Sequence, residues 1–276
     1  MQEQAKHLQY VESWQQQDEH QQNAAASKRL KHSRKARRDK GKKLIKPRDL
    51  VVLLWIAQQY AARLDHVQEL LSRMPGRGGR QVSPSGLTLS AVLQVVDRWV
   101  TLGLVEYRRI YDGEPGWVHV TPFGLRMLHL PFARHTPAES TLPHLHNINC
   151  VRLEVERRHP GYQWVSERML RAAQLRREEG SLVPHLPDAQ VLQPKAVALE
   201  VERSPKSPKE LDGILIELLM TGTPAADAEH PLIYTTVWYF VTEHTRRGVE
   251  EARDRLPAEL QARVKVYSLE TLAPLS

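Results

Sequence analysis

Residues 185–206 read HLPDAQVLQPKAVALEVERSPK, and this stretch decides the fold that we expect for the second half of the chain. An apolar run over 189–192 follows a proline and Asp188, and it predicts a short strand. The alternation of AVALEVE over 196–202 predicts the next strand. The sequence therefore predicts two neighbouring strands that both carry acidic residues.

Three carboxylates are expected to lie close together on these strands. Glu200 and Glu202 are two residues apart, so their side chains share one face, and Asp188 comes from the neighbouring strand. Carboxylates in this arrangement hold a hard divalent cation, which we expect to be Mg²⁺ or Mn²⁺. Such a cation activates water and stabilises charge on a phosphodiester. We therefore expect Asp188, Glu200 and Glu202 to be metal ligands and catalytic residues, with Lys206 just past the strand to steady negative charge.

The spacing of the glutamates leaves a second interpretation open. Surface charge pairs are common and contribute little to stability. Glu200 and Glu202 would then belong to an exposed strand face and pair with Arg203 and Arg168.

The order of these residues resembles the PD-(D/E)xK nucleases. In that class an acid after proline opens the motif, and an acid-x-lysine pair follows on the adjacent strand. Glu202 stands where the lysine is expected, as in some restriction endonucleases of the class, and Lys206 is interpreted as a migrated lysine. The resemblance also implies a further glutamate on the preceding helix, and three candidates remain open: Glu154, Glu156 and Glu167.

Strands alternate with helices over 144–276, which predicts an α/β nuclease-like domain after a linker at 134–143. The expected helices are 144–159, 167–178, 210–220 and 246–256, and the expected strands are 162–165, 189–192, 196–202, 232–241 and 264–268.

The region before the linker has helical patterning followed by strands. Apolar residues recur at three and four over 49–74, and Asp65 is expected to cap a second helix within that range. Thr88 is expected to cap a third helix, and Gly103 to end it.

Two strand-like runs, 104–111 and 117–121, then flank a turn and predict a hairpin. Two runs, LGLVEYRR at 102–109 and WVHVTPFGL at 117–125, resemble the end of many winged-helix regulators. In those proteins a helix ends on Gly-Leu, the wing follows, and a T-x-x-G turn starts the next helix. The resemblance implies an α+β winged helix-turn-helix DNA-binding domain over 49–133.

Positive charge is concentrated in one segment. The 276-residue chain has a formal net charge of +7, and residues 28–48, with twelve Lys or Arg and one Asp, contribute +11 of it. Dense basic runs bind polyanions, and their neutralisation of phosphates makes affinity depend on salt. We therefore expect residues 1–48 to be a disordered, Gln-rich and basic arm that binds DNA.

The expected DNA contacts come from this arm, from a Gly- and Arg-containing loop, from the third helix and from the wing. They are Lys28, Arg29, Arg34, Lys35, Arg37, Arg38, Lys42, Lys43, Arg77, Arg80, Ser90, Gln94, Arg98, Arg108 and Arg109.

The motifs WVSERMLR (164–171), HLPD (185–188), EVERSPK (200–206) and VWYFV (237–241), downstream of a winged helix, resemble the replication-relaxation family of mobile elements. The resemblance implies a DNA-binding protein linked to the replication, transfer or transposition of a plasmid, phage or conjugative element. We expect a metal-dependent DNA endonuclease or nickase. The alternative is a non-catalytic regulator or accessory factor whose degenerate nuclease fold recruits a protein partner. A weaker third interpretation is an RNA-binding factor that uses the arm alone.

Other classes are disfavoured. The single cysteine, Cys150, excludes an intramolecular disulfide and is interpreted as a small buried side chain. With no HExxH motif, structural or solvated roles are favoured for four histidines: His144, His146, His159 and His185. No apolar run is long enough to span a bilayer, so we expect a cytoplasmic, nucleoid-associated protein with no membrane partner. A homodimer is compatible with the sequence, which leaves the oligomeric state open.

Overall fold

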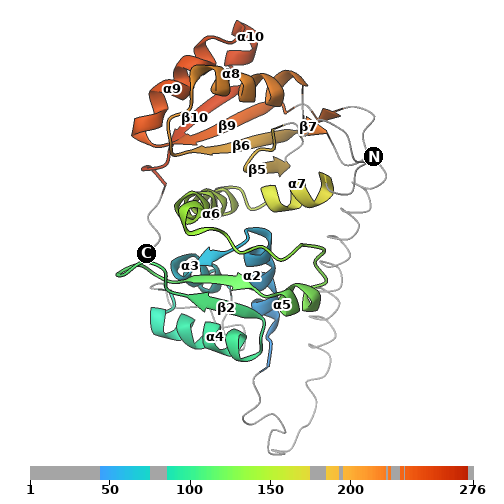
Figure 1. Ribbon diagram of the computed structural model, residues 1–276, viewed down its shortest axis with the longest axis vertical. Helices are drawn as coiled ribbons and strands as arrows, with labels where there is room; N and C mark the ends of the chain where they lie inside the picture. The colour runs from blue at the N-terminus through green and yellow to red at the C-terminus, as the bar shows by residue number, and fades with distance from the viewer. Residues whose placement is uncertain are drawn as a thin grey trace, which may run out of the picture.

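The computed structural model describes residues 44–74, 86–174, 185–192, 195–221, 223–224, 231–232 and 234–272. The fold is mixed α/β, with a three-stranded, a five-stranded and a two-stranded sheet among these residues. Figure 1 shows helices α8, α9 and α10 on one side of the five-stranded sheet and helix α6 on the other. The three-stranded sheet and its helices lie beyond α6.

The first part of the described chain folds around the three-stranded sheet, whose strand order is β1-β3-β2 and whose pairings are antiparallel. Its elements are α2 (Pro47–Gln58), β1 (Ala62–Arg63), α3 (Leu64–Ser72), α4 (Leu89–Thr101), β2 (Val105–Arg108), β3 (Trp117–Val120) and α5 (Pro122–Met127). The predicted helices and hairpin are present, with shorter strands than expected. The two-residue strand β1 was not predicted, because two residues carry no detectable alternation.

The caps of these helices agree with the sequence at two positions and not at a third. Thr88 caps α4, since its hydroxyl accepts the backbone N–H of Ala91, and Gly103 follows the helix with φ +71°. Asp65 was wrongly predicted as the cap of α3. The cap is Arg63, whose backbone N–H donates to Nδ1 of His66 at 3.1 Å.

The T-x-x-G turn after β3 has a steric reason for its glycine. Thr121 accepts the N–H of Gly124 at 3.0 Å and donates to the carbonyl of Gly103 at 2.6 Å. A Cβ at Gly124 would lie 2.2 Å from the Leu104 carbonyl oxygen, which no side chain tolerates.

The five-stranded sheet has the order β10-β9-β6-β5-β4. Strands β4, β5 and β6 are antiparallel neighbours, whereas β6, β9 and β10 run parallel. The strands are β4 (Gln163–Ser166), β5 (Ala189–Leu192), β6 (Ala196–Glu202), β9 (Thr236–Val241) and β10 (Val264–Ser268). The strand predicted over 232–241 is wrong at its start, because 231–232 pairs with 223–224 in the separate ribbon β7–β8.

Helices cover both faces of this sheet. They are α6 (Leu142–Arg158), α7 (Glu167–Gln174), α8 (Pro208–Ile216), α9 (Glu243–Asp254) and α10 (Ala258–Gln261), with short turns η2 (Glu139–Thr141) and η3 (Glu217–Thr221). Val197, Leu199 and Val201 pack in one cluster with apolar residues of α6. Ala198 packs in the opposite cluster with α8 and α9. The alternation of β6 therefore serves two buried faces.

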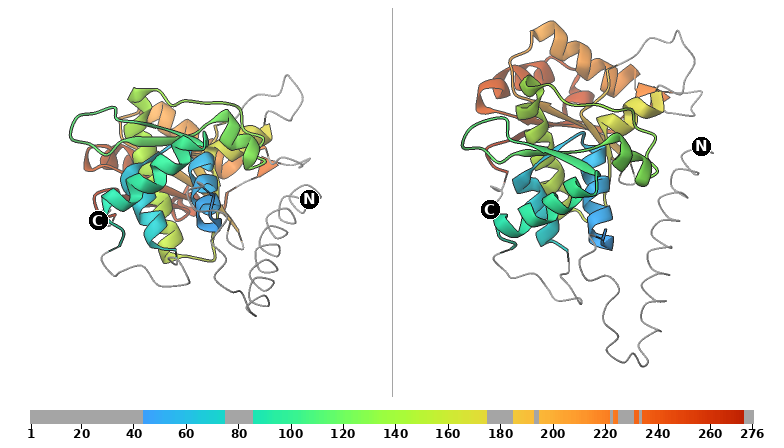
Figure 2. Two further views of the ribbon diagram at one scale, coloured as in Figure 1. Left: turned by 90° about the horizontal axis from the view of Figure 1, so that it is seen from below. Right: turned by 60° about the horizontal axis from the view of Figure 1, so that its bottom comes forward.

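Helix α6 also connects the two main sheets. Figures 1 and 2 show α6 and α7 between them. Leu142 and Leu145 of α6 pack in one cluster with Trp117 of β3. Trp55 Nε1 donates to Glu156 at 3.1 Å. The two parts of the chain therefore share a packed interface rather than only a linker. None of the described helices is both long and apolar enough to cross a membrane.

Candidate functional site

The register of β5 and β6 brings Asp188 to the glutamates. Ala189 pairs with Leu199, so Asp188 and Glu200 are the next residues at the same end of the two strands. The backbone N–H of Val201 donates to Asp188 Oδ2 at 2.8 Å, which fixes the aspartate against β6.

The two glutamates lie on a buried face of β6. Glu200 and Glu202 are each only 5% exposed, and they are level with Tyr239 and Val241 of β9. The interpretation of an exposed, charged strand face is therefore wrong. Arg168, its expected partner, donates instead to two backbone carbonyls elsewhere.

Each carboxylate has its own basic partner. His144 Nε2 lies 3.0 Å from Asp188 Oδ1, and His185 Nε2 lies 2.8 Å from Glu200 Oε1. Lys206 pairs with Glu202. These six side chains form what we call the acid site: His144, His185, Asp188, Glu200, Glu202 and Lys206. Its three carboxylates are neighbours, but their oxygens do not form a group within 4.8 Å of one another, and each carboxylate has a separate basic partner.

Burial and charge at the acid site shift several pKa values. The pKa of Glu200 is raised to about 7, mainly by burial. The hydrogen bond from His185 lowers this pKa, whereas the negative charge of Asp188 raises it. Burial alone would lower the pKa of His185, but its bond to Glu200 and the nearby carboxylates raise it above the usual value. The pKa of Lys206 is raised in the same way by Glu202 against the effect of burial.

Two residues near the acid site were missed by the sequence. Tyr239 is 1% exposed, and its hydroxyl has no hydrogen-bond partner among the described residues. Burial, followed by the charges of Glu200, Glu202 and Asp188, raises its pKa well above 10. Glu217 accepts the backbone N–H of His185 at 2.7 Å. Tyr239 lies within the VWYFV run, but nothing in that run marks it as a site residue, because it meets the acids only through the pairing of β6 with β9. No motif marks Glu217, which reaches His185 from a segment 32 positions away.

None of the three expected helix acids shares a hydrogen bond or ion pair with the acid site through its carboxylate, although the backbone N–H of Glu167 donates to the Asp188 carbonyl at 3.0 Å. Glu154 pairs with two arginines of its own helix, and Glu156 accepts from Trp55 and Arg152. Glu167 accepts from Tyr60 at 2.5 Å and pairs with an arginine one turn on. The preceding helix contributes His144 instead, for which the sequence favoured a structural or solvated role.

The predicted DNA-reading face of α4 needs one correction. Ser90 and Gln94 are exposed, as a base-reading helix requires. Arg98 is not available in the same way, because both oxygens of the fully buried Asp49 accept from its Nη2, at 2.7 and 2.8 Å. The exposed row also contains Asp97, whose charge would repel phosphates.

The wing presents one paired and one unpaired arginine. Arg108 is exposed and bonded to Glu106 at 2.9 Å, while Arg109 is exposed with no partner among the described residues. The remaining expected DNA contacts lie outside the described residues: Lys28, Arg29, Arg34, Lys35, Arg37, Arg38, Lys42, Lys43, Arg77 and Arg80.

A second cluster lies away from the acid site. Within the described ranges, the one group of three or more His, Cys, Asp or Glu residues whose ligand atoms fall within 4.8 Å of one another is His66, His146 and Cys150. The expectation of a structural or solvated role for His146 took no account of His66, which comes from a different helix.

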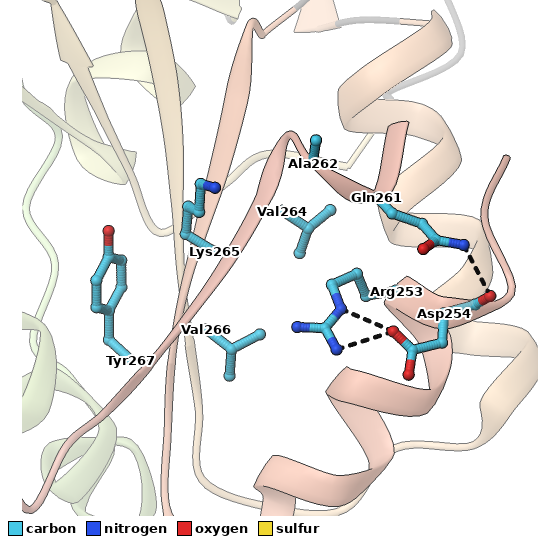
Figure 3. A pocket seen from close by; sticks show the side chains of 8 residues that line it. All are labelled: Arg253, Asp254, Gln261, Ala262, Val264, Lys265, Val266 and Tyr267. Atoms are coloured by element: carbon cyan, nitrogen blue, oxygen red, sulfur yellow. Dashed lines mark hydrogen bonds and ion pairs between the residues drawn. The ribbon is translucent and has the colours of Figure 1, made fainter. Parts of the chain in front are cut away.

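Figure 3 shows an open hollow of about 480 Å³ beside the edge strand β10. It is lined by Arg253, Asp254, Gln261, Ala262, Val264, Lys265, Val266 and Tyr267. Arg253 and Gln261 both bond to Asp254, and no lining residue belongs to the acid site. The hollow therefore adds no group to the chemistry described above.

Comparison with protein-family models finds no match to the chain. Comparison with curated proteins and with solved structures finds no match either. The geometry of the chain's own residues therefore carries the functional proposal.

Proposed function

We propose that this chain is a DNA-binding protein of a mobile element and a metal-dependent DNA endonuclease or nickase. The observation that carries the proposal is that Asp188 and the buried Glu200 and Glu202 are neighbours at one end of β5 and β6. The resemblance to PD-(D/E)xK nucleases rests on this arrangement, in which an acid follows proline and a pair of acids lies on the adjacent strand.

The donor set fits a hard divalent cation. Three carboxylates supply oxygen ligands of the kind that Mg²⁺ and Mn²⁺ prefer. The hydroxyl of Tyr239, buried beside them without a partner among the described residues, offers one more oxygen. Asp188 and Glu200 would bind the cation after turning away from His144 and His185. When bound, the cation would supply an activated water and neutralise charge on the phosphate.

The chain's own residues would supply the rest of the chemistry. Lys206, held against Glu202, places a positive charge where negative charge develops on the phosphate. His185, bonded to Glu200, is positioned to hold a proton at Nε2 once the glutamate binds metal.

DNA delivery is assigned to the first part of the chain. The order α2, β1, α3, α4 and the hairpin β2–β3 supports a winged helix, with α4 as the DNA-reading helix. Ser90, Gln94 and Arg109 are the described side chains that remain suited to DNA contact. Deleting residues 1–43, which leaves α2 and its cap Lys46 in place, is expected to weaken DNA binding and flatten its salt dependence without changing any site preference, measured by titration at several salt concentrations.

The nuclease proposal is tested on supercoiled, linear and branched DNA with Mg²⁺ or Mn²⁺. Wild-type protein should cleave at least one of these, and Asp188→Asn and Glu200→Gln should each lower the rate at least about 100-fold. Glu259→Gln, at an exposed position of α10, is the matched control and should cleave like wild type. Cleavage that persists at the wild-type rate in both variants would contradict the proposal.

One observation favours a second candidate, a non-catalytic DNA-binding accessory factor. All three carboxylates already have a histidine or lysine partner, so the site is electrostatically satisfied without a cation. If wild-type protein binds DNA but cleaves none of the substrates with either metal, this candidate replaces the nuclease.

A further inference from the structure

Three side chains from two helices meet at the interface between the two parts of the chain. His66 Nε2 lies 2.9 Å from His146 Nδ1 and 3.7 Å from Cys150 Sγ, and that sulfur lies 3.8 Å from His146 Nδ1. We call this group the His-His-Cys cluster. It shares no residue with the acid site, and the proposed nuclease does not use it.

The helices place these side chains for local reasons. His146 and Cys150 are four residues apart on α6, so they lie on one face, one turn from each other. His66 is the third residue of α3 and is fully buried, whereas the other two are half-buried. Solvent therefore reaches the cluster at His146 and Cys150, and not at His66.

The separations match those of ligands around one tetrahedral zinc ion. With the usual Zn–N and Zn–S lengths, such ligands stand about 3.3 Å (N to N) and about 3.6 Å (N to S) apart. The cluster needs to open by only a few tenths of an ångström between the two rings. Two imidazoles and a thiolate select zinc over Mg²⁺, which prefers oxygen.

We propose that His66, His146 and Cys150 bind one Zn²⁺ ion, with water in the fourth position. The thiol gives its proton to solvent as the sulfur–zinc bond forms, and the ion takes the place of the hydrogen between the two rings. Since α3 belongs to the first part of the chain and α6 to the second, the ion acts as a clamp between them.

Zinc binding changes the hydrogen bond at the other nitrogen of His66. That nitrogen, Nδ1, accepts the backbone N–H of Arg63, so it must take up a proton when Nε2 binds metal. Asn149 provides the acceptor: it is fully buried 3.4 Å from Nδ1, and its Oδ1 has no partner among the described residues. Turning this amide exchanges its bond to the Ala61 carbonyl for one from His66. The cost is the cap bond from the Arg63 N–H and the bond from Asn149 to Ala61, because the turned amide oxygen then faces the Ala61 carbonyl. Three metal–ligand bonds outweigh this cost.

The test uses the full-length, untagged and reduced protein after removal of metals with a chelator. Titration with Co²⁺ is expected to reach one ion per chain with a thiolate-to-cobalt absorption band in the near ultraviolet, and Zn²⁺ is expected to abolish that band. Cys150→Ser should lose the band, and His146→Gln should weaken binding about 10- to 100-fold or more. His244→Gln, at an exposed position of α9, is the matched control.

A second measurement covers the case in which a variant fails to fold. In wild-type protein, stoichiometric Zn²⁺ should protect Cys150 from a thiol reagent and raise the melting temperature, and excess Mg²⁺ should do neither. Absence of the cobalt band in wild type, or a band that His146→Gln leaves at wild-type affinity, would overturn the proposal.

Discussion

At the scale of single residues, Arg98 shows how a side chain can satisfy a pattern and serve another purpose. Its position on the outward side of α4 favoured base reading, but its guanidinium lies against Asp49 of α2. The aspartate also accepts the backbone N–H of Lys46 at 2.8 Å. A buried carboxylate held in this way fixes α2 against α4.

Arg98→Ala is therefore expected to act on stability. It should lower the free energy of unfolding by about 3 kcal/mol, because Asp49 would remain buried without its main hydrogen-bond partner. The measurement is urea denaturation followed by tryptophan fluorescence. Gln94→Ala, on the exposed side of the same helix, should change the value by less than about 0.5 kcal/mol. Unchanged stability with lost DNA binding would restore Arg98 as a base-reading residue.

At the scale of elements, α6 makes contacts that join the two parts of the chain, and ion pairs stabilise its last turn. The hydrogen bond from Arg157, followed by that from Arg158, lowers the pKa of Glu154 to about 2 in spite of partial burial. Two arginines in the last turn also complement the helix dipole.

This shift predicts a dependence of stability on pH. Because the pKa of Glu154 in the folded state lies below its unfolded value, its contribution is full above about pH 4.5 and is lost as the pH falls toward 2. After allowance for solvent around the exposed arginines, the contribution is about 1 kcal/mol. Glu154→Gln should remove it, so that denaturation between pH 5 and about 2.5 shows a shallower loss of stability than in wild type. Glu259→Gln is the control, and an unchanged acid limb in Glu154→Gln would contradict the assignment.

At the scale of the whole molecule, buried arginines connect the first part of the chain to the second. Arg168 of α7 donates to the carbonyls of Ala57 and Ala133 at 2.6 and 2.8 Å, and its guanidinium lies 4.8 Å from the rings of Tyr60 and Phe132. These contacts hold α7 against the end of α2 and against the segment that contains Phe132 and Ala133.

We expect the wild-type chain to unfold in one cooperative transition. Arg168→Met should lower stability by about 3 kcal/mol, since it leaves two carbonyls without their donor, and it should split the transition in two. Thermal denaturation followed by both circular dichroism and tryptophan fluorescence measures this. Arg171→Met, one turn further along α7 and exposed, is the control. A single transition with wild-type stability in Arg168→Met would show that the interface depends on other contacts.

Local patterns were enough to place much of the secondary structure. The strands at 189–192, 196–202 and 264–268 were predicted with the bounds that the structure gives, because alternation and flanking turn residues are local signals. The caps at Thr88 and Gly103 were predicted for the same reason.

What surrounds each side chain depended on pairings between distant segments. The sequence marked Asp188, Glu200 and Glu202, but only the sheet register decided that both glutamates are buried and lie level with Tyr239 and Val241. His66 and Cys150 are 84 positions apart, so no local period relates them. The physical reason is that hydrophobic periodicity and capping act within a few residues, whereas burial, charge pairing and ligand geometry arise when packed elements meet.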